Sequence, residues 1–125
     1  MNIALWIVQG LLAAMFLMAG FMKLSQTKSG LKENLGDWVD AIPGNSIKLI
    51  GLLEIAGAVG LILPMLLDVQ PMLTPVAAIG LALTMLAAMF LHLSRKENNK
   101  IAPNILFLLL AVFVAYGRFV LVPVV

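Results

Sequence analysis

Four polar residues lie within or at the ends of long apolar segments, where their side chains could do chemistry. They are Lys23, Glu54, His92 and Asn104, and each belongs to a different apolar segment. An amine, a carboxylate, an imidazole and an amide can together hold protons and hydrogen-bond a polar ligand. If the segments pack side by side in alternating directions, all four residues fall in the same half of the bundle, as a site in a bundle core requires.

Glu54 is the most informative of the four, because a charged side chain at the centre of a membrane helix costs roughly 2.5–3.5 kcal/mol. Gly51, Gly57 and Ala58 are its neighbours at i−3, i+3 and i+4, so Glu54 lies on a face of small residues. Such a face is where membrane helices approach one another closely. Two interpretations stay open: Glu54 bonds a neighbouring helix and only stabilises packing, or it lines a ligand site.

The other three residues each have a simpler explanation. Lys23 could extend its amine to the membrane surface, and His92 could serve as a hydrogen-bonding group near a helix end. Asn104 follows Pro103 and could satisfy free N–H groups where its helix begins. One histidine cannot hold a metal alone, so no metal site is expected, and the four residues are treated as a candidate ligand-binding cluster.

The elements that position these residues follow from composition. The chain has 125 residues, 62% hydrophobic and 11% charged, with a mean hydropathy of +1.08, whereas soluble domains have about 25% charged residues. Lipid must therefore surround it, and a span needs about 20 residues. This predicts an all-α, single-domain membrane bundle of four helices over about 3–22, 47–67, 73–93 and 105–122. The absence of cysteine excludes thiolate chemistry, and a net charge of +2 gives no reason to expect nucleic-acid binding.

The one long polar stretch lies between the first two spans. Within it, apolar residues recur at helical spacing opposite acidic ones, which predicts an interfacial helix over about 30–42 with Trp38 as a membrane anchor. Pro43 and Gly44 end it. The alternative is a loop whose apolar residues pack on the end of the bundle.

Several of these segments resemble the DoxX-like family. The match lies in Gly51-Leu-Leu-Glu-Ile-Ala-Gly-Ala-Val-Gly-Leu-Ile-Leu-Pro64, Ala19-Gly-Phe-Met-Lys-Leu24, Pro103-Asn104 and Tyr116-Gly117-Arg118. The resemblance implies a four-helix membrane fold. Some relatives are small subunits of a thiosulfate:quinone oxidoreductase or of terminal oxidase assemblies, so it also implies a quinone as a possible ligand and other membrane redox subunits as possible partners. It brings no set of catalytic residues, and whether the chain is an enzyme stays open.

The leading functional hypothesis is therefore a small subunit or quinone-associated module of a membrane redox assembly. No motif for haem, flavin or an iron–sulfur cluster is present. A small transporter is one alternative, because four helices and one membrane glutamate resemble small multidrug exporters. Those proteins carry the glutamate in their first helix, however, and Glu54 lies in the second. A non-catalytic partner that helps to assemble other membrane proteins is the other alternative. Self-association of the chain also stays open.

Basic residues predict the orientation of a multi-pass protein in the plasma (inner) membrane. The first and third connections hold seven of the eight lysines and arginines, at positions 23, 28, 32, 48, 95, 96 and 100. Only Arg118 lies toward the other side, where it is expected at the level of the outer lipid headgroups. The positive-inside rule therefore places these two connections in the cytoplasm and both termini outside.

This orientation can be measured with reporter fusions. A periplasmic reporter should be active at either terminus, and a cytoplasmic reporter should be active after Lys28 or Lys96. A C-terminus on the cytoplasmic side would contradict the charge argument.

Overall fold

The computed structural model describes residues 1–124, and four long helices dominate them. Each contains an 18-residue window with a mean hydropathy of 2.1 or 2.2 and is long enough to cross a membrane, if the fourth is taken with its flanking turns as Asn98–Leu121. These helices are α1 (Asn2–Ser25), α3 (Gly44–Leu66), α4 (Leu73–Ser94) and α5 (Ile101–Tyr116); a 3-10 turn, η2 (Asn98–Lys100), precedes α5 and a π-helical turn, η3 (Gly117–Leu121), follows it. Large apolar side chains such as Phe90, which is 77% exposed, cover the outside of the bundle. The predicted all-α membrane bundle is confirmed.

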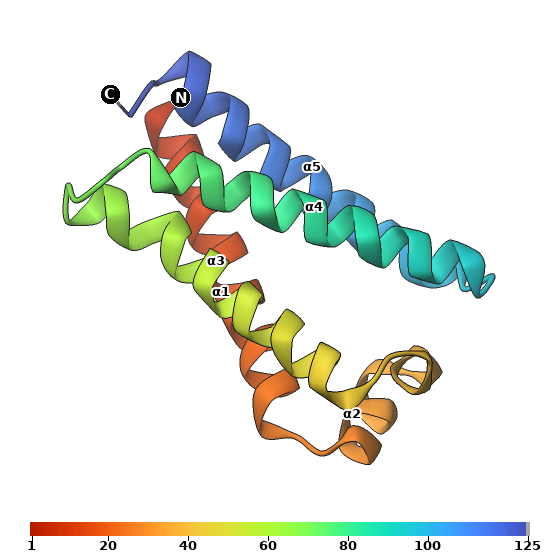
Figure 1. Cartoon of the computed structure of the whole chain (residues 1–125). Coiled ribbons are helices and arrows are strands. Elements are labelled where there is room, and N and C mark those ends of the chain that lie inside the picture. The colour runs from red at the N-terminus through yellow and green to blue at the C-terminus, as the bar shows by residue number, and fades with distance from the viewer. Residues whose placement is uncertain (125) are drawn as a thin grey trace.

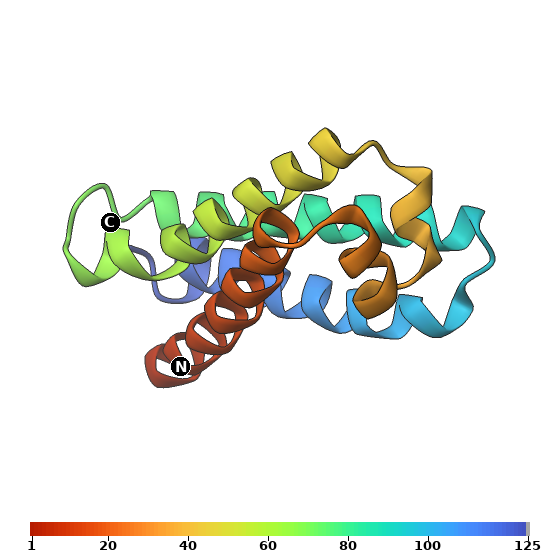
Figure 2. The same ribbon diagram turned by 90° about the horizontal axis from the view of Figure 1, so that it is seen from below.

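The helices are arranged as two pairs. α1 packs mainly against α3 and α4 against α5, and the pairs meet chiefly along α3 and α4 (Figures 1 and 2). Both termini lie at the end of the bundle that carries the α3–α4 connection, hereafter the termini end (Figure 1). The α1–α3 and α4–α5 connections lie at the other end, so the four helices do alternate in direction.

Glycines set the distance between α1 and α3. A Cβ added to Gly20 would lie 2.5 Å from the carbonyl oxygen of Gly51, and one added to Gly51 would lie 2.8 Å from the carbonyl oxygen of Gly20. Real side chains do not tolerate such distances to backbone, so both positions need glycine. α3 and α4 are also close, because a Cβ on Gly60 would lie 2.7 Å from that of Ala77.

The centre of the bundle is filled by apolar side chains from all four long helices. Leu12 and Phe16 come from α1, and Leu61 from α3. The other buried members of this cluster are Ala58, Ala78, Leu81, Ala82, Met85, Ala111, Val114 and Ala115. No polar side chain belongs to it, so it forms an apolar layer across the middle of the bundle.

The connection between α1 and α3 contains a short helix, as predicted, but it is not one continuous helix over 30–42. It contains α2 (Lys28–Leu35) and a 3-10 helix, η1 (Asp37–Ala41), separated by Gly36 at φ +116°. Only glycine adopts that φ readily, so the break is built into the sequence. We call α2 and η1 together the strap. Its apolar side chains, Leu31 and Val39, pack on Ile47 at the start of α3.

The predicted spans agree with the observed helices to within a few residues at most ends. The second span begins earlier than predicted, at Gly44 instead of about 47, and the helical turns of the fourth begin at Asn98 instead of about 105. Pro75 and Pro103 occupy first turns, where a missing N–H leaves no helix bond unmade.

The close glycine contact gives a stability prediction. Gly51→Ala should lower the free energy of unfolding by about 1–3 kcal/mol, because its methyl group would press on the α1 backbone. Gly10→Ala is the matched control, since an added Cβ there has nothing within 4 Å. Unfolding in mixed detergent, followed by circular dichroism, would measure both. Equal stability of the two variants would contradict the observed approach.

Candidate functional site

One cavity of about 460 Å³ contains all four of the polar residues singled out in the sequence. Lys23 comes from α1, Glu54 from α3, His92 from α4 and Asn104 from α5. The remaining lining is mostly apolar: Trp38, Ile42, Ile50, Leu53, Leu83, Thr84, Met85, Ala87, Ala88 and Leu91. We call this space the Glu54 cavity. It lies in the half of the bundle nearer the strap, on the far side of the apolar layer from the termini.

Lys23 and Glu54 form a direct ion pair. Lys23 Nζ lies 2.6 Å from Glu54 Oε1, and the two side chains are 12% and 3% exposed. The Gly20–Gly51 contact one turn away makes this possible, because it brings Lys23 on α1 against α3. The structure thus gives Glu54 a partner on a neighbouring helix, and its charge is matched inside the bundle.

Asn104 lines the cavity with an unused hydrogen-bond donor. Its amide nitrogen Nδ2 is buried and has no partner among residues 1–124. A buried donor left without an acceptor costs about 1–3 kcal/mol. An exception of this kind calls for an explanation, and a ligand with an oxygen acceptor would supply one.

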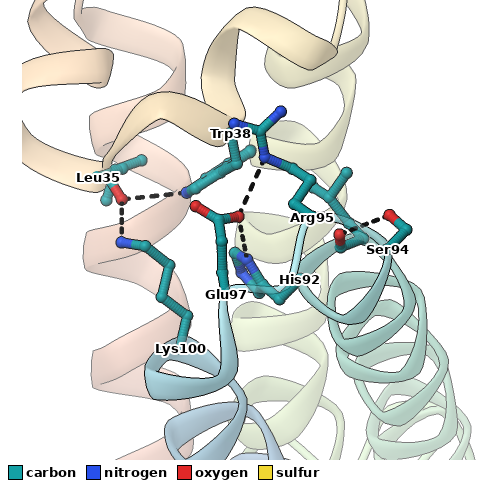
Figure 3. A network of polar contacts seen from close by, with 8 residues as sticks. Leu35, Trp38, His92, Ser94, Arg95, Glu97 and Lys100 are labelled. Carbon is teal, nitrogen blue, oxygen red and sulfur yellow. Dashed lines mark hydrogen bonds and ion pairs between the residues drawn. The ribbon is translucent and has the colours of Figure 1, made fainter.

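His92 forms no hydrogen bond or ion pair with the other three residues. Its Nδ1 lies 3.2 Å from Glu97 Oε1, and the same oxygen accepts a 3.1 Å hydrogen bond from Arg95 Nε (Figure 3). The bond to His92, and then that to Arg95, holds the pKa of the Glu97 carboxyl below its usual range. His92 is 7% exposed and forms part of the cavity wall. Its Nδ1 is occupied by the bond to Glu97.

The strap completes the cavity wall through Trp38, which the sequence indicated only as a membrane anchor. The Trp38 ring meets the His92 ring edge-on, with centroids 6.0 Å apart. Trp38 Nε1 and Lys100 Nζ both donate to the carbonyl oxygen of Leu35, at 3.1 and 3.0 Å (Figure 3). Lys100 therefore fastens the strap to the start of α5, and the strap holds Trp38 against the cavity.

The open side of the Glu54 cavity faces the surface that lipid covers. Leu53 on α3 and Leu83 on α4 both line it, and they are 55% and 60% exposed on the outside of the bundle. A molecule dissolved in the bilayer could therefore reach the polar residues between α3 and α4 without crossing water.

A second polar cluster lies near the termini end and was only partly foreseen. Arg118 was expected among the outer headgroups, but it is 1% exposed. Its Nε donates to Gln9 Oε1 and its Nη1 to Asn2 Oδ1, each at 2.7 Å, and its guanidinium lies 5.4 Å from the centre of the Trp6 ring. Gln9, a polar residue within the first apolar run, was the signal that sequence analysis missed.

The Lys23–Glu54 ion pair gives a prediction about the stability of the protein. Glu54→Gln should lower the free energy of unfolding by about 3 kcal/mol, because it leaves the Lys23 charge buried without a partner. The double variant Lys23→Met/Glu54→Leu should recover most of that loss, since an apolar pair needs no partner. Chemical unfolding of the wild type and all variants, including each single change, would measure the coupling. A double variant as unstable as the sum of its single changes would show that the two residues act separately.

Comparison with known protein families supports the membrane-protein fold described above. Residues 7–114 match the model of the DoxX-like family. Neither the search of curated proteins nor that of solved structures returned a match. The family match covers well over half of the chain, including α3 and α4 in full and most of α1 and α5. This four-helix membrane protein therefore belongs to the DoxX-like family.

Proposed function

We propose that this protein is a small subunit or quinone-associated module of a membrane redox assembly, and that the Glu54 cavity binds the quinone headgroup. The observation that carries the proposal is the unpaired amide donor of Asn104 in a mostly apolar, lipid-facing cavity. A quinone fits these features because it is a lipid-soluble molecule with oxygen acceptors on a flat apolar ring.

The size and lining of the cavity support this ligand class. Small-molecule sites commonly measure about 300–1,000 Å³ and combine apolar walls with a few placed polar groups. The Glu54 cavity, at about 460 Å³, lies within that range. Its polar groups lie on four different helices, so a headgroup between them would contact both helix pairs. A long apolar tail would leave past Leu53 and Leu83 into the bilayer.

The polar residues would have separate tasks. Asn104 would donate to one carbonyl oxygen through its free Nδ2, and Lys23 would place a positive charge near the ring. A bound quinone accepts two electrons and two protons, and Lys23, Glu54 and His92 are the titratable residues that line the cavity. The chain has no motif for a redox centre, so electrons would come from a partner subunit.

The test uses Trp38, which lines the cavity, as a fluorescent reporter. In a Trp6→Phe background, which leaves Trp38 as the only tryptophan, a short-tailed ubiquinone or menaquinone should quench the emission saturably in nanodiscs. Asn104→Leu should weaken that binding about tenfold, which corresponds to about 1.4 kcal/mol for one lost hydrogen bond. The same change should leave the free energy of unfolding equal or higher, because it removes an unpaired buried donor.

Thr84→Val is the matched control within the same cavity. The Thr84 hydroxyl already donates to the carbonyl oxygen of Gly80 in its own helix, at 3.0 Å, so its loss should change quinone affinity less than twofold. Quenching without saturation, or equal affinity for wild type and Asn104→Leu, would contradict the proposal. Substrate-driven proton exchange in liposomes without quinone binding would instead support the transporter alternative.

A further inference from the structure

Arg118 is a buried cation that forms no ion pair with an acidic side chain of residues 1–124. It is 1% exposed, and none of the ion pairs among residues 1–124 includes it. Its two hydrogen-bond acceptors, Gln9 and Asn2, are neutral amides. They satisfy Nε and one hydrogen of Nη1 but supply no charge. A buried charge that has only neutral partners remains uncompensated.

The guanidinium also has an unused donor. Its Nη2 is buried and has no hydrogen-bond partner among the described residues. Arg118 lines a cavity of about 410 Å³ at the termini end. The other residues that line it are Asn2, Trp6, Met65, Asp68, Pro71, Val122, Pro123 and Val124. We call it the Arg118 cavity. Nη2 and the second hydrogen of Nη1 can therefore donate in parallel to two oxygens of one anion.

We propose that the Arg118 cavity binds an oxyanion of the phosphate class at the termini end of the bundle. The phosphate could belong to the headgroup of an anionic lipid or to a free phosphate ester, since both present the same oxygens. Asn2 and Gln9 hold the guanidinium in place from the α1 side, and the Trp6 ring covers one of its faces. This site is separate from the Glu54 cavity, because the apolar layer lies between them.

Asp68 allows a more specific prediction about anion binding in the Arg118 cavity. It lines the Arg118 cavity but is exposed and does not pair with Arg118. An anion in the cavity would be repelled by this carboxylate, so Asp68→Asn should tighten anion binding severalfold. Asn2→Asp should have the opposite effect. It places a carboxylate where Nη1 already donates, so the chain would supply its own anion and the external one should no longer bind.

The experiment measures the melting midpoint of delipidated protein in neutral detergent. One arm adds dimethyl phosphate against chloride at equal ionic strength, and the other adds phosphatidylglycerol against diacylglycerol, which has no phosphate. Wild type should melt at a higher temperature with at least one phosphate source, because a ligand that binds only the folded state stabilises it. The rise should be larger in Asp68→Asn and absent in Asn2→Asp. A rise with dimethyl phosphate marks a site open to free phosphate esters, and a rise with phosphatidylglycerol alone marks a lipid site.

Lys28→Gln is the control for the basic connections at the other end of the bundle. Lys28 is exposed and forms no ion pair within residues 1–124, so its loss should leave the phosphate effect unchanged. Loss of the effect in Lys28→Gln would place anion binding at the strap end and overturn the proposal. So would a wild-type midpoint that neither source raises, or an Asn2→Asp protein that responds as strongly as wild type.

Discussion

The close approach of α1 to α3 is the contact on which the rest of the structure depends. Lipid provides no hydrophobic reason for helices to associate, so they need tight packing and matched polar groups. Gly20 and Gly51 allow the two backbones to approach closely. This approach places Lys23 and Glu54, one turn away, within ion-pair distance. The close glycine contact and the buried Lys23–Glu54 ion pair therefore depend on each other. Without the glycines Lys23 could not reach Glu54 at 2.6 Å, and without Lys23 the carboxylate would lie unpaired in the bundle.

The two polar clusters differ in charge and in access. The Glu54 cavity combines an internally neutral ion pair with a free amide donor, and its open side faces lipid. The Arg118 cluster holds an unmatched positive charge near the termini. Between them, Ala58 and Leu61 on α3 belong to the apolar layer, and the carbonyl oxygen of Leu61 is the acceptor for Gln9 Nε2. This layer of apolar side chains lies between the two clusters.

Much of this arrangement could be predicted from sequence, because membrane helices leave few alternatives. Four apolar runs of span length force alternating helices, and that alone brings Lys23, Glu54, His92 and Asn104 to one half of the bundle. Contacts that depend on rotation of one helix about its axis could not be predicted. Periodicity does not show that Arg118 turns inward onto Gln9, or that His92 turns its polar edge to Glu97. The strap was predicted as one helix because its apolar spacing continues across Gly36, and only the backbone shows the break.

The strap determines how rigid the Glu54 cavity is. Trp38 belongs to a connecting segment, yet it is fixed by its hydrogen bond to Leu35, by its contact with His92, and by the bond of Lys100 to the same Leu35 carbonyl. That wall is therefore preorganised, and preorganised sites lose less freedom when a ligand binds. The opposite side, between Leu53 and Leu83, has no such bonds across it among the described residues. Any opening that admits a ligand is accordingly expected where α3 and α4 face lipid, with the strap and the Lys23–Glu54 pair remaining in place.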